Sequence, residues 1–103
     1  MLGELRVKYT DTDENFALPG RRAYLYAFRI RDGFRNRGYG THLMKTVLDT
    51  LKDAGYSEFT VGVEDDNSVA KHMYAAQGFT EFVLRKEETY QGDTYSYNLY
   101  LKR

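Results

Sequence analysis

An apolar strand, a loop rich in glycine and arginine, and an amphipathic helix follow one another directly in the first half of the sequence. Ala23–Ile30 is almost continuously apolar, which is typical of a central strand covered on both faces. After the loop, apolar residues recur at helical spacing on one face: Leu43, Met44, Val47, Leu48 and Leu51. Because parallel strands need a crossover connection, a strand and a helix joined in this way predict a layered fold with a second, parallel strand.

The other elements can be predicted from similar patterns. A second helix is expected over Val69–Gln77, with Gly78-Phe79 ending it, and Gln91-Gly92-Asp93 is typical of a turn. Further strands are predicted where apolar residues alternate or run together: Leu5–Tyr9, Phe59–Val63, Phe82–Leu84 and Tyr95–Leu101. We therefore expect one domain over residues 1–103 of the α/β (α+β) class. Its mixed, twisted sheet is flanked by two helices in the order β-β-α-β-α-β-β.

Composition excludes several classes of protein. The 103 residues suffice for one small domain, and 15 basic and 15 acidic residues cancel, which argues against binding to nucleic acid by charge alone. The absence of cysteine excludes disulfides and acyl-cysteine intermediates, and His42 and His72 lack metal-ligand spacing, so no metal is expected. No apolar run reaches the roughly 18 residues that span a bilayer. Without a signal-peptide pattern, a cytoplasmic protein is expected, with no membrane partner.

The loop before the first helix has the features of an anion site. Gly38 and Gly40 allow the backbone to approach a ligand closely, and Arg35 and Arg37 add positive charge. The first N–H groups of a helix lack partners within the helix and lie at the positive end of its dipole. A phosphate or diphosphate is the expected ligand, and a plain tight turn is the alternative. The third glycine of a dinucleotide fingerprint and the Gly-Lys-Ser/Thr of a P-loop are both absent.

Two motifs resemble those of the GNAT-type N-acetyltransferases. Arg35–Gly40 is similar to the R/Q-x-x-G-x-G/A signature of that family, and Asn67–Phe79 resembles its N-x-x-A-x-x-x-Y-x-x-x-G-F motif. A helix and a strand separate the two motifs, as the family pattern requires. The resemblance extends from about Leu2 to the C-terminus. It implies a splayed sheet that binds acetyl-coenzyme A (acetyl-CoA) between the strands near Ile30 and Val63.

The resemblance also implies which residues bind the cosubstrate. In the family, the pantetheine arm bonds to the backbone of the strand before the loop, which corresponds here to Phe28, Arg29 and Ile30. The diphosphate is bound by loop N–H groups, which correspond to Arg35, Asn36, Arg37, Gly38, Tyr39, Gly40 and Thr41. Asn67 matches an asparagine that often contacts the ligand, with a helix N-cap as the alternative. Lys71 is either a contact to the 3′-phosphate or a solvated surface lysine.

Tyr74 matches the tyrosine whose hydroxyl faces the coenzyme sulfur in that family. An amine that attacks a thioester expels a thiolate, and a phenol with a pKa of about 10 can protonate a thiolate of similar basicity. Tyr74 is thus implied to be the general acid in a direct transfer, and a packed aromatic is the alternative. No base is assigned. Tyr24 stands where the histone-acetylating branch has a glutamate. The remaining candidates for the base are a water relay or one of Glu64, Asp65 and Asp66. The alternative role of these carboxylates is to place negative charge at the start of a helix.

The acceptor is expected to be a primary amine of a small molecule or peptide. Asp11, Asp13 and Glu14 either attract a cationic amine or form a solvated loop. The tyrosines near the C-terminus, at 90, 95, 97 and 100, are candidates for the lining of a substrate cleft. Tyr95 and Tyr97 share a face with Leu99, so for these two the first expectation is packing in the core or in a dimer interface.

Family members usually carry a strand and two helices ahead of this region. The chain is therefore expected to be a shortened, truncated member, a fragment of a longer protein, or a domain whose cleft a second copy completes. Its sheet is expected to expose apolar surface, which predicts a homodimer. The alternative function is a non-catalytic coenzyme A-binding or interaction module whose acceptor site is incomplete.

Overall fold

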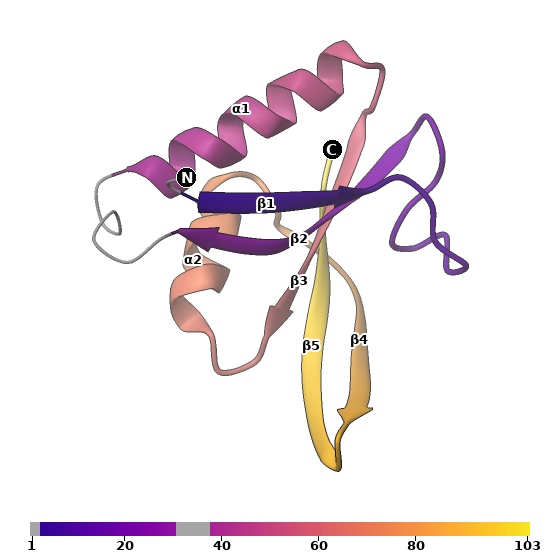
Figure 1. The fold of residues 1–103 in the computed structure, drawn as a ribbon. Coiled ribbons are helices and arrows are strands. Elements are labelled where there is room, and N and C mark those ends of the chain that lie inside the picture. The colour runs from indigo at the N-terminus through magenta and orange to yellow at the C-terminus, as the bar shows by residue number, and fades with distance from the viewer. Residues whose placement is uncertain (1–2, 31–37) are drawn as a thin grey trace.

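The computed structural model describes residues 3–30 and 38–103 of the chain (Figure 1). Within these residues the elements are β1 (Gly3–Lys8), β2 (Arg22–Ile30), α1 (Tyr39–Asp53), β3 (Glu58–Glu64), α2 (Ser68–Ala76), β4 (Glu81–Tyr90) and β5 (Asp93–Lys102). Their order confirms the predicted β-β-α-β-α-β-β arrangement. None of the helices in the described ranges is long and apolar enough to cross a membrane.

The strands form one mixed sheet in the order β1-β2-β3-β5-β4. β2 and β3 pair in parallel and the other neighbours are antiparallel. Both helices pack on one face of the sheet, which we call the helix face. One apolar core forms there from three sources: Leu25, Phe59, Val61 and Val63 of the sheet, Met44, Leu48 and Leu51 of α1, and Tyr74 of α2. The predicted apolar stripe of the first helix is therefore confirmed as its core-facing side.

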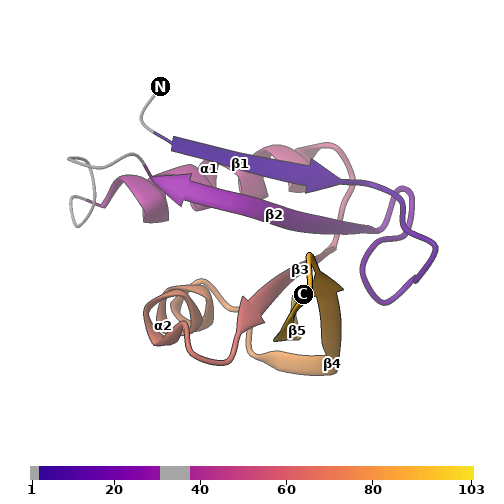
Figure 2. The same ribbon diagram turned by 60° about the horizontal axis from the view of Figure 1, so that its bottom comes forward.

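β2 and β3 pair over only part of their length. The register joins Arg22–Leu25 to Glu58–Val61 and then ends. Beyond this point β2 continues to Ile30 beside β1, and β3 continues to Glu64 beside β5. Figure 2 shows the ends of β2 and β3 diverging. The sheet is thus splayed, as predicted, with its closed end at Arg22 and Glu58.

A β-bulge in β2 lies where the strands diverge. β2 has two residues, Ala27 and Phe28, at the point where β1 has only Leu5, and Ala27 adopts a left-handed backbone with φ 53°. An extra residue reverses which face the following side chains occupy. Phe28 therefore turns to the helix face, where its ring lies 6.2 Å from that of Tyr74.

The prediction that β2 is covered on both faces is wrong. Tyr26 is 37% exposed on the face opposite the helices, where its ring stacks on that of Tyr24 at 5.7 Å. The apolar run Ala23–Ile30 misled because tyrosine serves equally as a core residue and as the wall of an open site.

The face opposite the helices, here called the open face, is covered in part by the β1–β2 loop. Phe16 and Ala17 of this loop are buried, and the Thr60 hydroxyl donates a 2.6 Å hydrogen bond to the Phe16 carbonyl. Leu99 and Leu101 of β5 pair with Gly62 and Thr60, so their side chains lie on the same face as that of Thr60. Both leucines are buried there. The loop leaves the rest of the open face accessible.

A glycine ends α2 and fixes Tyr74 against the sheet. Gly78 adopts φ 100° and its N–H donates to the Ala75 carbonyl, while the Phe79 N–H donates to the Tyr74 carbonyl. These bonds form a Schellman motif. The motif places the Phe79 ring 5.9 Å from the Tyr74 ring, so the predicted roles of Gly78 and Phe79 are confirmed.

Candidate active site

The amino terminus of α1 lies near the end of β2, on the side where β2 and β3 diverge (Figure 2). Gly38 precedes the helix with φ 78°, and α1 has no acidic residue in its first turn. The positive end of the helix dipole therefore favours an anion near Tyr39, Gly40 and Thr41. Binding of a diphosphate by these residues stays a prediction. Arg35, Asn36 and Arg37 lie outside the described residues.

The edge of β2 that faces β3 lacks a strand partner in its outer half. Residues 26–30 pair with β1 on one side, and no described strand pairs with their other side. Phe28, Arg29 and Ile30 lie in this half, so the backbone of the predicted pantetheine-binding segment borders the gap. Extended backbone groups of this kind can bond to an amide-containing chain.

Tyr74 lies on the helix face of the same gap. Its side chain is buried, packed between the rings of Phe28 and Phe79. Every fully buried side-chain N or O atom in the described residues has a hydrogen-bond partner, and the Tyr74 hydroxyl has none there. The hydroxyl oxygen is therefore not fully buried, although most of the ring is. Burial also raises the pKa of the Tyr74 phenol, which keeps its proton in place at neutral pH.

Asn67 caps α2. Its side-chain oxygen accepts a 3.1 Å hydrogen bond from the Ala70 N–H, so the N-cap interpretation is confirmed. Lys71 is exposed on the next turn of the helix, where it remains open to solvent or ligand. A contact from Asn67 or Lys71 to the cosubstrate stays a prediction.

Asn67→Ala should lower the free energy of unfolding by about 1 kcal/mol, because the Ala70 N–H loses its acceptor. Asn67→Asp keeps an acceptor oxygen and should be nearly neutral. Urea unfolding of both variants measures this difference. Equal stability of the alanine variant and the native chain would contradict the cap.

Three consecutive acidic residues at the end of β3, Glu64, Asp65 and Asp66, lie in different surroundings. Asp65 accepts a 2.7 Å hydrogen bond from Asn98 and forms an ion pair with Arg85. Hydrogen bonds from Arg85 and Asn98 hold the pKa of Asp65 below its ordinary value, so this carboxylate is a weak base. Asp65 and Asp66 precede the Asn67 cap and lie outside the first turn of α2. Glu64 instead lines a cavity on the open face.

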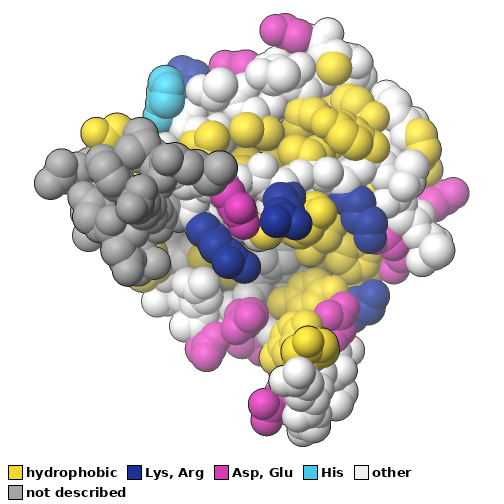
Figure 3. Space-filling model, in the orientation of Figure 1, with side chains coloured by type: hydrophobic (Ala, Val, Ile, Leu, Met, Phe, Trp, Pro, Cys, Tyr) yellow, Lys and Arg dark blue, Asp and Glu magenta, His cyan; other side chains and the backbone are white. Residues whose placement is uncertain are grey.

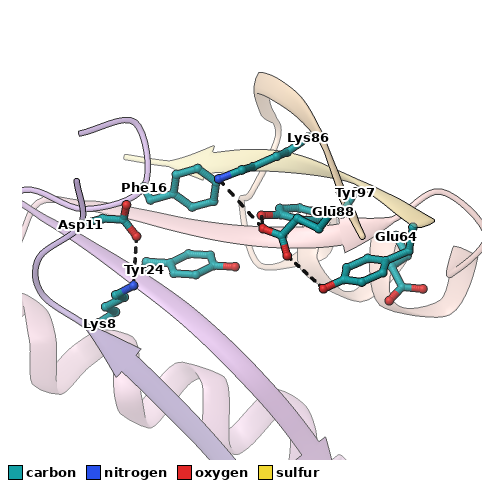
Figure 4. A pocket seen from close by; sticks show the side chains of 10 residues that line it. Lys8, Asp11, Phe16, Tyr24, Glu64, Lys86, Glu88 and Tyr97 are labelled. Atoms are coloured by element: carbon teal, nitrogen blue, oxygen red, sulfur yellow. Dashed lines mark hydrogen bonds and ion pairs between the residues drawn. The ribbon is translucent and has the colours of Figure 1, made fainter. Parts of the chain in front are cut away.

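This open-face cavity has a volume of about 420 Å³ (Figure 4). Tyr24 lies on one side of it and Tyr97 on the other, and the Glu88 carboxylate accepts 2.9 Å hydrogen bonds from the hydroxyls of Tyr95 and Tyr97. Tyr95 and Tyr97 share a face with Leu99, as predicted, but they line this cavity instead of joining the core.

Tyr24, at the position of the family glutamate, is not a base. Burial raises the pKa of its phenol to about 12, with contributions from the charges of Glu88 and Asp11. The hydroxyl is therefore protonated at neutral pH and can only donate or accept hydrogen bonds there.

Sequence reasoning missed five residues of the cavity, namely Lys8, Phe16, Gly62, Lys86 and Glu88. Two features of the sequence could have indicated three of these residues. Phe16 begins a short apolar run in a polar loop, and Lys86 and Glu88 are two residues apart in β4 and so share one face of the sheet. Asp11, predicted as a solvated or amine-attracting residue, also lines the cavity, while Asp13 accepts bonds from Asn15 within the loop.

Charges on the described surface are mixed. Figure 3 shows basic and acidic side chains interleaved with apolar ones on the face that it presents. Among residues 3–30 and 38–103, no group of three or more histidines or carboxylates is placed to hold a metal ion. The candidate site residues described above therefore lie at two places, the gap between β2 and β3 and the open-face cavity.

Solved structures share this architecture. Ard1 from Thermoplasma volcanium superposes with a TM-score of 0.76 over 96% of this chain and 61% of its own, at 19% identity. NAA60 of Arabidopsis thaliana, solved in complex with acetyl-CoA, gives a TM-score of 0.68 over 78% of this chain and 47% of its own, also at 19% identity. At such identities these structures show a common fold.

The family model described as acetyltransferase (GNAT) family matches residues 3–79. The chain belongs to this family, which confirms the resemblance inferred from its two motifs. A thialysine N-epsilon-acetyltransferase of Mus musculus is 34% identical over 65 residues, which are 60% of this chain. That match spans only 38% of the mouse protein.

Proposed function

We propose that this chain transfers the acetyl group of acetyl-CoA directly to a primary amine. The observation that carries the proposal is the gap between β2 and β3. An unpaired strand edge and the Tyr74 hydroxyl border it, and the start of α1 lies near the end of β2 on the side where the strands diverge. The family membership and the acetyl-CoA bound by a structural neighbour support the choice of acyl donor. The thialysine enzyme supports an amine acceptor.

Each part of the gap has a role in this reaction. The N–H groups at the start of α1 would bind the diphosphate, and the edge of β2 at Phe28 and Ile30 would bind the pantetheine amides. Acetyl-CoA supplies an activated thioester. The Tyr74 hydroxyl holds a proton for the departing sulfur, and its raised pKa keeps that proton available at neutral pH. Binding both reactants at one gap supplies the proximity that direct transfer needs.

Calorimetric titration with acetyl-CoA, followed by an assay of amine-dependent thiol release, tests the proposal. We expect saturable binding of one acetyl-CoA and thiol release that requires a primary amine. Absence of binding would exclude both acetyl transfer and coenzyme A binding. Binding without thiol release across a panel of amines would support the non-catalytic module instead.

A further inference from the structure

We propose that the open-face cavity binds an acceptor that carries a second cationic group, in the manner of an aliphatic diamine. In this arrangement the far ammonium group of the acceptor takes the place that the Lys86 ammonium now occupies, while the near amine faces the gap. The inference rests on the proposed function and assigns the class of acceptor.

The charges around the cavity favour a cation. Three carboxylates, Asp11, Glu64 and Glu88, line it together with two lysines, Lys8 and Lys86. The Lys8 ammonium lies 3.1 Å from an Asp11 oxygen, so these two charges offset one another. Two carboxylates then face one ammonium. An acceptor with a carboxylate at its far end would meet net negative charge, whereas an ammonium group would offset it.

The cavity already contains a cation site, which Lys86 occupies. Its Nζ lies 5.0 Å from the centroid of the Phe16 ring and 4.0 Å from Glu88 Oε1 (Figure 4). An ammonium group over an aromatic ring and beside a carboxylate gains both cation–π and Coulomb attraction. The Lys86 side chain is 46% exposed on a flexible stem, so an incoming ammonium can displace it into solvent.

Two hydrogen bonds orient the Glu88 carboxylate, which lies beside the Lys86 ammonium. The Tyr95 and Tyr97 hydroxyls each donate to a different oxygen of Glu88, at 2.9 Å. Burial, with Glu88 as a further cause, raises the pKa of Tyr97, and the Glu88 hydrogen bond raises that of Tyr95, so both phenols donate these bonds and keep their protons at neutral pH. The two hydrogen bonds thus hold the Glu88 carboxylate in one orientation.

The cavity borders the gap at which the acetyl group would be transferred. Gly62 lies in its wall and is the first residue of β3 beyond the pairing with β2. A Cβ at this glycine would lie 3.0 Å from Tyr97 Cδ2 and 3.3 Å from the Tyr24 hydroxyl. The absence of a side chain there lets both aromatic walls approach the strand. An acceptor in the cavity can therefore extend past Gly62 toward the diverging strands.

The test compares 1,4-diaminobutane with butylamine, which lacks the second ammonium group. Lys86→Met should lower the KM for 1,4-diaminobutane about fivefold, because the acceptor no longer competes with a resident cation. Glu88→Gln should raise that KM about fivefold. The KM for butylamine and the Kd of acetyl-CoA should change little in either variant. Lys45→Met and Glu87→Gln remove the same charges from exposed positions outside the cavity, as matched controls.

Two results would overturn the inference. One is a KM for 1,4-diaminobutane that neither cavity variant changes. The other is an equal change in the KM for butylamine, which would mean that the far ammonium group is not recognised. These outcomes differ from failure of the proposed function, because butylamine-dependent thiol release by the native chain tests transfer alone. If no amine is acetylated, calorimetric titration of 1,4-diaminobutane into the native chain and Lys86→Met still measures the site, and unchanged affinity would contradict it.

Discussion

Tyr74→Phe should lower kcat about 100-fold while leaving the Kd of acetyl-CoA within about twofold of the native value. The substitution removes only the hydroxyl, and loss of a general acid typically costs 10²-fold or more in rate. The ring keeps its contacts with Phe28 and Phe79, so the fold and the gap between β2 and β3 should persist. Steady-state kinetics with a saturating amine gives kcat, and calorimetry gives the Kd.

The matched control is Tyr100→Phe. Tyr100 is a partly buried tyrosine that packs against the same core, but it belongs to β5 and not to α2. This variant should keep native kcat. An unchanged kcat in Tyr74→Phe would remove Tyr74 from the chemistry and leave it as a packing residue. A parallel loss of acetyl-CoA affinity would point instead to a distorted gap.

Local patterns in the sequence were sufficient to predict the elements and their order. The helical stripe at Met44 and Leu48, and the glycine that ends α2, depend on residues a few positions apart, and the structure has each where it was predicted. The Tyr74 position followed from the motif Asn67–Phe79. Such features depend on local backbone geometry and local apolar contacts, which a single sequence displays.

The features that the sequence did not predict depend on contacts between distant residues. The bulge at Ala27 exists because β1 and β2 differ in length by one residue between paired positions, which no single segment encodes. The open-face cavity combines the β1–β2 loop with β2, β3 and the β4–β5 hairpin. Phe16 lies in its wall, where the Thr60 hydroxyl, 44 positions along the chain, donates to the Phe16 carbonyl. The side chains of this cavity are brought together by the pairing of the strands and by the packing of the β1–β2 loop on the sheet.

The closed end of the splayed sheet depends on one buried carboxylate, Glu58. Its side chain is 5% exposed, and its oxygens lie 2.9 Å from Arg22 Nε and 3.2 Å from Arg103 Nη1. Arg22 and Glu58 are also the first pair in the register between β2 and β3. These charge-assisted bonds join the two strands at one end, while the absence of pairing beyond Leu25 leaves the other end open. Glu58 therefore contributes both to the stability of the fold and to the shape of the gap between β2 and β3.

Glu58→Ala should lower the free energy of unfolding by about 3 kcal/mol at pH 7, because it leaves the mostly buried Arg22 guanidinium without its partner. Burial raises the pKa of Glu58, but the Arg22 hydrogen bond and the charges of Arg22, Arg21 and Arg103 outweigh this effect and lower it. A lowered pKa in the folded state contributes stability above the ordinary value of 4.5, and this contribution is lost as the pH falls through the folded value.

Urea unfolding at pH 7 and pH 3 measures the effect, and the difference between the native chain and Glu58→Ala should be smaller at pH 3. Glu81→Ala is the control, because Glu81 also binds Arg103 but its side chain is 52% exposed. It should change the free energy of unfolding little at either pH, as expected for an exposed ion pair. A difference for Glu58→Ala that stays constant with pH would mean that packing of the side chain, and not its charge, holds β2 to β3 at the closed end.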